Sequence, residues 1–436
     1  MIADGLTSTA LLTDQYELTM LAAALADGSA QRQCTFEVFA RRLPNGRRYG
    51  VVAGTGRVLA ALREFRFGET ELAVAARFLD DRTLEWLRGY RFRGEIDGYR
   101  EGELYFPGSP ILTVRGSFAE CVLLETLILS IYNHDSAIAA AAARMVSAAG
   151  GRRMIEMGSR RTHELAAPAS ARAAYLAGFD ATSNLEAARS FGVPSAGTSA
   201  HAFTLLHSGA DGSHEAAAFR SQVQALGVGT TLLVDTFDIT RGVDTAIEVA
   251  GPELGGVRID SGDLGVLARQ VRDQLDALGA IRTRIVVSGD LDEYAIASLR
   301  AEPVDVYGVG TSLVTGSGAP TAGMVYKLVE VEGIPVAKRS SHKESRGGTK
   351  RAVRLARRTG TIVEEIVYPA SASGPDTNGF ELRELQVPLV RDGEVLTDQP
   401  TLAQSRELVA KGLISLPWEG LKLSAGDPAI PTTFQG

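Results

Sequence analysis

The sequence predicts an α/β fold, an irregular (β/α) barrel of about seven strands, flanked by an α+β sandwich-like domain. The main observation is a region, residues 153–312, in which short apolar runs ending in small or polar residues alternate with helical stretches. Such alternation is typical of a parallel sheet with crossover helices. The region contains seven such runs and no glycine fingerprint of a dinucleotide-binding sheet, which favours a barrel over an open sheet.

Composition and charge are those of an ordinary folded protein. The chain has 436 residues, of which 45% are hydrophobic and 22% charged, whereas a mainly disordered chain is poorer in apolar residues. The length allows about two or three domains, or one barrel with an added domain. A formal net charge of −7 argues against a nucleic-acid-binding surface, so we expect no nucleic-acid partner.

Cysteine usage and apolar runs point to the cytoplasm. Cys34 and Cys121 are too few for a disulfide framework or a four-thiolate zinc site, and we interpret both as small buried hydrophobic residues. The N-terminus lacks the basic region of a signal peptide. The most apolar run, residues 118–131, is too short to span a bilayer and contains Glu120 and Glu125, so it predicts a buried helix. We therefore expect a cytoplasmic protein without a membrane partner.

The first domain, residues 1–115, is predicted to mix helices and strands. A helix rich in Leu and Ala ends at Gly28, and Asp14 has Glu17 three residues later, which is the spacing of a capping box. Strand-like residues then flank an Asn-Gly pair at 45–46, the dipeptide most typical of a tight β-hairpin.

The barrel, residues 116–324, is expected to carry the active site, because chemistry in such barrels takes place at the carboxyl ends of the strands. The C-terminal segment, residues 325–436, is expected to pack with the N-terminal domain. Within it, residues 338–358 hold nine Lys or Arg and one acidic residue. One interpretation of this stretch is a solvated loop and helix face, and the other is a site for a phosphate-rich small ligand. Nucleic acid is disfavoured because no aromatic residue interleaves the charges.

One apolar run ends in residues 197–201, Gly-Thr-Ser-Ala-His, and this segment has three properties that suit a ligand site. The glycine lets the backbone approach a ligand, the hydroxyls donate hydrogen bonds, and His201 can act as a nucleophile or an acid–base group. The alternative is a helix N-cap with an incidental histidine. No other histidine has comparable surroundings, and no pair has the spacing of a zinc site, which argues against a structural metal.

A second constellation lies at residues 258–263, Arg-Ile-Asp-Ser-Gly-Asp. A strand places Arg258 and Asp260 on the same side, because they are two residues apart. Arg258 can then clamp a carboxylate or phosphate, and Asp260 can bind sugar hydroxyls. The alternative is an Arg258–Asp260 ion pair, with Ser261 or Asp263 capping the next helix.

Two further strand ends carry small and polar residues. Asp290 follows one apolar run, where it either contributes to a site or caps its helix. Gly310 and Thr311 follow the next run and can present backbone N–H groups and a hydroxyl to a phosphate, which late barrel loops often bind. Glycine pairs alone are weak signals.

Seven motifs in this order resemble nicotinate phosphoribosyltransferase. They are LLTDQYELTM (11–20), FEVFARRLPNGRRYGVVAG (36–54), EMGSRR (156–161), GTSAHAF (197–203), RIDSGDL (258–264), VSGDLDEY (287–294) and GVGTSLVT (308–315). Each motif is short, but seven in sequence are highly specific, and the resemblance extends from about residue 11 to about residue 360.

The resemblance implies the transfer of a phosphoribosyl group from 5-phosphoribosyl 1-diphosphate to nicotinate, giving nicotinate mononucleotide and diphosphate in the Preiss–Handler route to NAD. It implies coupling to ATP through a phosphohistidine at His201. Asp260 and Asp290 are then expected to hold the ribose hydroxyls and the metal-bound diphosphate. Magnesium is expected to arrive with the phosphates, because it loses its water reluctantly.

The resemblance also implies a nicotinate site. Arg258 is the first choice for the partner of the pyridine carboxylate and Arg160 the second, and Thr198 lies in the same group of motifs. Met157 is expected against one face of the ring. Tyr16 is expected to stack on the other face from the neighbouring subunit of a homodimer with shared active sites. Ser183 stands where nicotinamide-using relatives carry an aspartate, which would repel a carboxylate.

The phosphates of the ribosyl donor and of ATP need further partners. The residues expected to bind them are Asp14, Arg41, Arg42, Ser261, Gly289, Gly310, Thr311 and Lys350. The sequence does not divide the basic residues among them between ATP and the ribosyl donor.

Three other interpretations are weighed against this one. Quinolinate phosphoribosyltransferase needs a second carboxylate clamp and no phosphohistidine, so the segment around His201 argues against it. A barrel aldolase or isomerase usually needs a strand-end lysine or a metal cluster, and the seven strand ends carry neither. A non-enzymatic binding role does not explain so many polar groups at strand ends.

Overall fold

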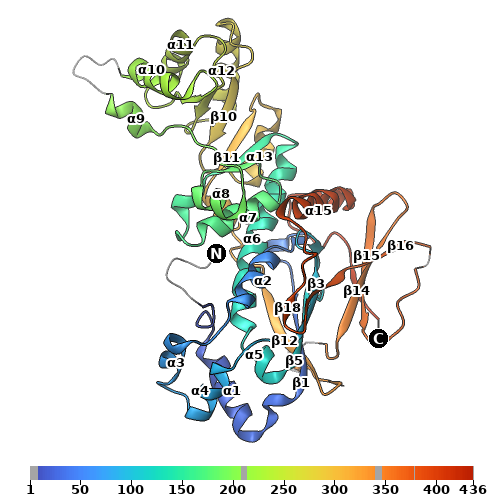
Figure 1. The fold of residues 1–436 in the computed structure, drawn as a ribbon. Helices are drawn as coiled ribbons and strands as arrows, with labels where there is room; N and C mark the ends of the chain where they lie inside the picture. The colour runs from blue at the N-terminus through green and yellow to red at the C-terminus, as the bar shows by residue number, and fades with distance from the viewer. Residues whose placement is uncertain (1–7, 208–213, 339–345, 378, 436) are drawn as a thin grey trace. The chain divides into compact units, whose positions relative to one another are not determined.

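The computed structural model describes residues 8–207, 214–338, 346–377 and 379–435. The chain divides into two compact units, one formed by Met1–Ala140 with Ala319–Gly436, and the other by Ala141–Gly318. We call them unit 1 and unit 2 and describe each by itself (Figure 1). The domain limits predicted from the sequence, at residues 115 and 324, stay predictions; the two compact units divide the chain at different residues.

Unit 1 contains a seven-stranded sheet to which both ends of the sequence contribute. Its order is β13-β12-β1-β5-β3-β17-β18, and all neighbours are antiparallel. Figure 1 shows the blue β1 beside the yellow-orange β12. The strands are β1 (Gln33–Ala40), β3 (Glu95–Tyr99), β5 (Leu112–Ser117), β12 (Met324–Val331), β13 (Ile334–Pro335), β17 (Gln386–Arg391) and β18 (Glu394–Val395).

Two smaller sheets and seven α-helices, counting α6, complete the described part of unit 1. A four-stranded sheet has the order β16-β14-β15-β19, and β2 pairs with β4. The sheets comprise β2 (Gly50–Val51), β4 (Leu104–Tyr105), β14 (Lys350–Ala356), β15 (Ile362–Pro369), β16 (Glu381–Glu384) and β19 (Thr432–Phe434). The helices are α1 (Gln15–Asp27), α2 (Thr55–Arg63), α3 (Glu69–Ala75), α4 (Asp81–Arg88), α5 (Phe118–Val122), most of α6 (Glu125–Ala149) and α15 (Leu402–Ser415). The sandwich-like packing expected for this region stays a prediction.

Helix α6 begins in unit 1 and continues into unit 2. Buried residues of α1 to α6 share one core with the seven-stranded sheet, and this core includes Leu21 of α1, Val38 of β1 and Val114 of β5. The apolar run at 118–131 forms the buried helix α5 and the start of α6, as predicted. Cys34 and Cys121 are both buried and free, which confirms their interpretation as small hydrophobic residues.

The N-terminal helix ends as predicted, but two local predictions are wrong. Helix α1 ends at Gly28, whose φ of 83° suits glycine. The capping box does not form, because the Glu17 carboxylate is buried and accepts hydrogen bonds from Thr13 and Thr126. The chain does turn at 45–46, but no hairpin forms, since β5 and β12 already occupy both edges of β1 and β2 pairs with β4.

Unit 2 is built on a six-stranded parallel sheet with the order β7-β6-β11-β10-β9-β8. The strands are β6 (Arg153–Glu156), β7 (Ala181–Thr182), β8 (Thr231–Leu233), β9 (Gly256–Ile259), β10 (Arg284–Ser288) and β11 (Val306–Val309). The intervening helices are α7 (Ala167–Leu176), α8 (Leu185–Phe191), α9 (His201–Leu206), α10 (Glu215–Leu226), α11 (Ile239–Ala250), α12 (Leu264–Ala277), α13 (Glu293–Ser298) and α14 (Thr311–Val314). This arrangement confirms the predicted alternation of strands and helices.

Six of the seven expected strands form in unit 2. The seventh run, at residues 193–201, makes only one isolated parallel bridge, between Thr182 and Ser195. Pro194 has no N–H group to donate, and the run makes two hydrogen bonds with Thr182, through the Pro194 carbonyl and the Ala196 N–H. The parallel sheet therefore has β7 and β8 at its two edges.

No helix in the described ranges is long and apolar enough to cross a membrane.

Candidate active site

A pocket of about 250 Å³ lies at the carboxyl ends of the parallel strands in unit 2. Its walls come from the ends of β6, β7, β8 and β9 and from the segment before α9, which is where a parallel α/β sheet places its ligands. Seven of the residues predicted from the sequence meet here, namely Met157, Arg160, Ser183, Thr198, His201, Arg258 and Asp260. The lining residues are Met157, Ser159, Arg160, Ser183, Ala196, Gly197, Thr198, Ser199, Ala200, His201, Leu233, Arg258 and Asp260.

His201 is the first residue of α9, and its imidazole lies between two side chains from the end of β8. Its Nδ1 is 3.1 Å from the hydroxyl oxygen of Thr236, and its Nε2 is 3.9 Å from Oδ1 of Asp235. The imidazole is 41% exposed, so it is open to a ligand. The helix-cap alternative for this segment is not found, because the N-cap residue Ala200 makes no side-chain cap.

Asp235 is a candidate functional residue that the sequence analysis missed. Its side chain is only 1% exposed, and its Oδ2 accepts hydrogen bonds from the Asp260 N–H at 2.8 Å and the Ser261 hydroxyl at 2.9 Å. Its Oδ1, which faces His201, is buried without a hydrogen-bond partner. The signal was its position directly after the apolar run of β8, the same strand-end position that identified Asp260.

Arg258 and Asp260 lie on one side of β9, as predicted, and Ser288 at the end of β10 connects them. The Arg258 Nε donates to the Ser288 hydroxyl oxygen at 2.8 Å, and its Nη2 donates to Asp260 Oδ1 at 2.9 Å. The Ser288 hydroxyl also donates to that carboxylate. Burial disfavours the charged form of Asp260, but hydrogen bonds from Ser288 and Arg258 and the guanidinium charge outweigh it and lower its pKa.

The structural interpretation of this segment is confirmed, whereas the binding roles of Arg258 and Asp260 stay predictions. The Arg258–Asp260 ion pair exists, and Asp263 caps α12 by accepting from the Val266 N–H. Arg258 and Asp260 nevertheless line the pocket beside His201. An ion pair that opens onto a cavity can hold a guanidinium in place for an incoming anion.

The strand ends next to this pocket carry the predicted phosphate-binding residues. Gly289 has a φ of 106°, and a side-chain carbon there would lie 2.4 Å from the Asp260 carbonyl oxygen, so glycine is required. Asp290 follows with a φ of 35°. It does not cap α13, because Asp292 does so. Thr311 begins α14 at the end of β11.

Gly310 and Ser261 lie close to the pocket residues. A side-chain carbon at Gly310 would lie 3.4 Å from the Met157 carbonyl oxygen. Ser261 donates a hydrogen bond to Asp235, which lies beside the pocket residue His201. These contacts connect the end of β11 to that of β6, and the end of β9 to that of β8.

Five predicted site residues belong to unit 1, namely Asp14, Tyr16, Arg41, Arg42 and Lys350. Asp14 is the N-cap residue of α1 without a side-chain cap, and Tyr16, the second residue of that helix, is 44% exposed. Burial of its hydroxyl and the nearby Glu125 carboxylate raise the pKa of Tyr16 to about 12. Arg41 and Lys350 are far apart in the sequence and line one pocket of about 300 Å³.

We call this second pocket the cationic pocket; its lining residues are Phe39, Arg41, Pro107, Gly108, Arg346, Lys350 and Phe434. The Arg41 Nε is buried without a hydrogen-bond partner, and the Arg346 guanidinium lies 4.1 Å from the ring centre of Phe434. The Lys350 Nζ is 2.8 Å from Glu37 Oε2 and donates to two backbone carbonyl oxygens. Lys350 is thus held in place by an anion of the protein itself.

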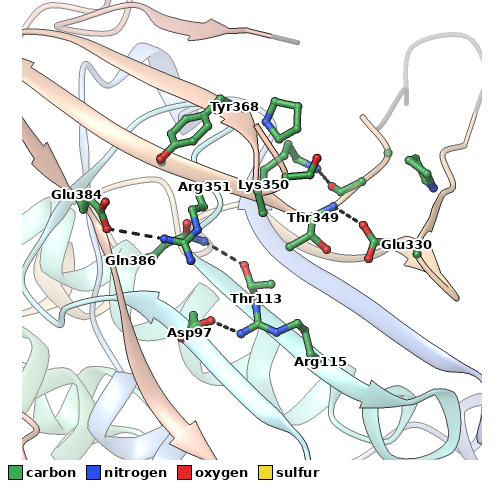
Figure 2. Close-up of a pocket in the computed structure, with 18 of the residues that line it drawn as sticks. Asp97, Thr113, Arg115, Glu330, Thr349, Lys350, Arg351, Tyr368, Glu384 and Gln386 are labelled. Carbon is green, nitrogen blue, oxygen red and sulfur yellow. Dashed lines mark hydrogen bonds and ion pairs between the residues drawn. The ribbon is translucent and has the colours of Figure 1, made fainter. Parts of the chain in front are cut away.

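A larger cavity of unit 1, about 780 Å³, is a weaker candidate. Figure 2 shows two ion pairs among the charged side chains that line it. Arg115 pairs with Asp97 on one wall, and Arg351 approaches Glu384 on another at 3.9 Å. A ligand would have to break these ion pairs to gain their charges, so we do not assign chemistry to this cavity.

No group of three or more His, Cys, Asp or Glu side chains in the described ranges is arranged to hold a metal ion. Magnesium needs fewer protein ligands than that, because it is commonly held by one or two carboxylates together with water and substrate phosphates. Asp260 and Asp290 offer donors of this type.

Comparisons with known proteins agree with this geometry. A family model described as the nicotinate phosphoribosyltransferase N-terminal domain matches residues 11–133, and the model of the nicotinate phosphoribosyltransferase family matches residues 152–362. The nicotinate phosphoribosyltransferase pncB1 of Mycobacterium tuberculosis is 69% identical over 97% of this chain and 94% of its own length. The human nicotinate phosphoribosyltransferase is 33% identical over 95% of this chain and 92% of its own.

Solved structures show the same similarity. The crystal structure of human nicotinic acid phosphoribosyltransferase has a TM-score of 0.84 at 29% identity and covers 97% of both chains. A nicotinate-nucleotide pyrophosphorylase from Pyrococcus furiosus has a TM-score of 0.79 at 25% identity, covering 95% of this chain and 97% of its own. The chain belongs to the nicotinate phosphoribosyltransferase family, whose members are enzymes of NAD biosynthesis.

Proposed function

We propose that this enzyme transfers the phosphoribosyl group of 5-phosphoribosyl 1-diphosphate to nicotinate and couples the transfer to ATP hydrolysis through a phosphohistidine at His201. The products are nicotinate mononucleotide, diphosphate, ADP and phosphate. The observation that carries the proposal is the pocket of unit 2, where His201 lies beside the buried Asp235 and within the same walls as Arg258.

Nicotinate binds through its carboxylate to Arg258, with Arg160 as a second cation of the same pocket. A guanidinium presents two parallel N–H groups to a carboxylate, and Ser288 and Asp260 hold that of Arg258 in position. Met157 supplies an apolar wall for the ring, and Thr198 a hydroxyl. Ser183 lines the same pocket with a neutral side chain, which tolerates the acid substrate better than a carboxylate would.

His201 attacks the γ-phosphorus of ATP, which breaks the bond to the ADP oxygen and leaves the phosphoryl group on a ring nitrogen. The imidazole gains positive character as this bond forms, and the buried Asp235 carboxylate next to it stabilises that charge. Water later takes the phosphoryl group from the histidine. Asp235 therefore serves as a positioning residue for His201.

The ribosyl transfer proceeds through an oxocarbenium-like ribose while diphosphate leaves, so positioning and charge stabilisation supply the catalysis. Asp260 and Asp290 hold the ribose hydroxyls. Gly289, Gly310 and Thr311 bind the 5-phosphate, and Ser261 borders that region. Magnesium, held by Asp260 and Asp290 together with the substrate, would neutralise charge on the diphosphate.

The proposal also assigns roles to four residues of unit 1. Arg41 and Lys350 of the cationic pocket bind phosphates of ATP or of the ribosyl donor, supported by the unpartnered Nε of Arg41. Tyr16 and Asp14 act at the active site of a neighbouring subunit in a homodimer. A cytoplasmic location is part of the same proposal.

One assay tests the substrate and the coupling together. Nicotinate, nicotinamide and quinolinate are each incubated with 5-phosphoribosyl 1-diphosphate, with and without ATP, and mononucleotide and diphosphate are measured. We expect turnover of nicotinate alone and marked stimulation by ATP. Equal turnover of nicotinamide would contradict the role of Ser183, and turnover of quinolinate would contradict the single carboxylate clamp.

The phosphohistidine has its own test. The His201→Ala variant is expected to lose the base-stable, acid-labile label that ATP with a radioactive γ-phosphate leaves on the wild-type protein, together with the ATP stimulation. A label that survives this substitution would show that another residue carries the phosphoryl group.

A further inference from the structure

Two short turns carry the side chains on one side of the unit 2 pocket. The turn after β6, residues 157–160, carries Met157 and Arg160, and the turn after β7 carries Ser183. Strand β7 has two residues, lies at the edge of the sheet and pairs with β6 at only two positions. Such a short edge strand fixes the following turn weakly by itself.

Glu156, the last residue of β6, connects these two turns. Its side chain lies in the interior, and the residue is only 1% exposed. One carboxylate oxygen accepts the N–H of Gly158 in the first turn, and the other accepts the hydroxyl of Thr182, the last residue of β7. Its backbone carbonyl accepts the N–H of Ser183 at 2.8 Å.

Asn184 closes the connection from the other side. Its N–H donates to the Thr182 hydroxyl oxygen at 2.9 Å, and its side-chain amide donates to the Ser159 hydroxyl oxygen, also at 2.9 Å. The two turns are thus joined both through the buried carboxylate and through this amide. We call Glu156, Ser159, Thr182 and Asn184 the turn clamp.

The turn clamp places a carboxyl group in the interior, where its charged form is disfavoured. Burial raises the pKa of the Glu156 carboxyl, against which the hydrogen bonds from Thr182 and Gly158 act. No described Lys or Arg side chain forms an ion pair with it. A buried carboxylate without a cation is less favourable for stability than an apolar side chain of similar volume, so stability alone does not explain this residue.

We propose that Glu156 is a positioning residue that fixes the two turns of the pyridine site through Thr182, and so sets the affinity of the enzyme for nicotinate. This inference rests on the proposed function, in which Met157, Arg160 and Ser183 line the nicotinate site. The expected effect is confined to the pyridine substrate, because the two turns carry the residues assigned to nicotinate. Neither Thr182 nor Glu156 lines the pocket, so each acts through these turns.

The test compares Thr182→Val, which removes the hydroxyl at nearly constant volume, with Thr182→Ser, which keeps it. We expect Thr182→Val to raise the KM for nicotinate about tenfold, as for a lost hydrogen bond to a charged group. The KM for 5-phosphoribosyl 1-diphosphate and the labelling of His201 by ATP should change less than about twofold. Thr182→Ser should restore most of the nicotinate KM.

Two results would overturn the inference. One is a folded Thr182→Val enzyme with an unchanged nicotinate KM. The other is an even loss, in which kcat and both KM values deteriorate together with the melting temperature, because that pattern indicates a merely structural role. If Thr182→Val does not fold, Glu156→Gln is measured in its place against the same criteria.

Arg258→Ala separates this inference from the proposed function. If Arg258→Ala raises the nicotinate KM and Thr182→Val does not, only the role of the turn clamp is wrong. If Arg258→Ala leaves the nicotinate KM unchanged, the proposed carboxylate site is wrong as well, and the inference falls with it.

Discussion

Nε2 of His201 lies 3.9 Å from Oδ1 of Asp235, a buried oxygen without a hydrogen-bond partner, while the other oxygen of Asp235 holds the Asp260 N–H and the Ser261 hydroxyl. One carboxylate therefore connects the histidine to the strand end that carries Arg258. A cation that forms on the imidazole ring would find its counter-charge already in place.

Asp235→Asn is expected to weaken phosphorylation of His201 more than binding of nicotinate. The amide keeps the volume but removes the charge that stabilises the imidazole cation, and the expected loss in the rate of labelling by ATP is about ten- to a hundredfold. Rapid-quench labelling measures it, with the nicotinate KM as the internal control. An unchanged labelling rate would contradict the role of Asp235.

Ser288→Ala is expected to raise the KM for nicotinate by about three- to tenfold. The substitution removes a neutral hydroxyl that accepts from the Arg258 Nε and donates to Asp260, and such a hydrogen bond is worth about 1 kcal/mol. Steady-state kinetics measure the effect. Ser298→Ala, which removes an exposed hydroxyl bonded within its own helix, is the matched control, and similar kinetics for the two variants would contradict this prediction.

Gly289→Ala is expected to lower both stability and kcat, because its φ is positive and the new methyl would meet the Asp260 carbonyl oxygen at 2.4 Å. A loss of about 2 kcal/mol or more is reasonable for a strained backbone with a clash. Gly251→Ala is the control, since Gly251 also has a positive φ but open space around it. Thermal unfolding of both variants isolates the clash, and equal melting temperatures would show that the loop simply moves aside.

Glu215 makes the stability of unit 2 depend on pH. Burial raises the pKa of its carboxyl from 4.5 to about 7, with Asp238 and Asp235 adding to the shift and Arg241 opposing it. The folded state thus binds the proton more tightly than the unfolded state, so the stabilisation is complete below about pH 4.5 and is lost as the pH rises to about 7.

The Glu215→Gln variant removes this dependence. Relative to wild type, its stability should be higher at pH 8 than at pH 5 by about 1 kcal/mol, because solvent screens a half-buried carboxyl. Urea unfolding at the two pH values measures the difference. Glu248→Gln, on an exposed position of α11, is the control, and a pH-independent difference for Glu215→Gln would contradict the prediction.

The sequence by itself determined the alternation of strands and helices and the polar residues at the strand ends. Periodicity is a local property, and parallel strands place their carboxyl ends at one edge, so His201, Arg258 and Asp260 could be assigned to one site in advance. The seven motifs also identified the family correctly.

Only the tertiary structure decided which neighbours these residues have. Asp235 looked like any acidic residue after a strand until burial left one of its oxygens facing His201. The Asn-Gly pair at 45–46 has the local conformation of a turn, but the partners of β1 come from β5 and β12, which no local pattern specifies. Strand pairing and side-chain contacts join residues distant in sequence, and their energies depend on burial, which only the folded chain defines.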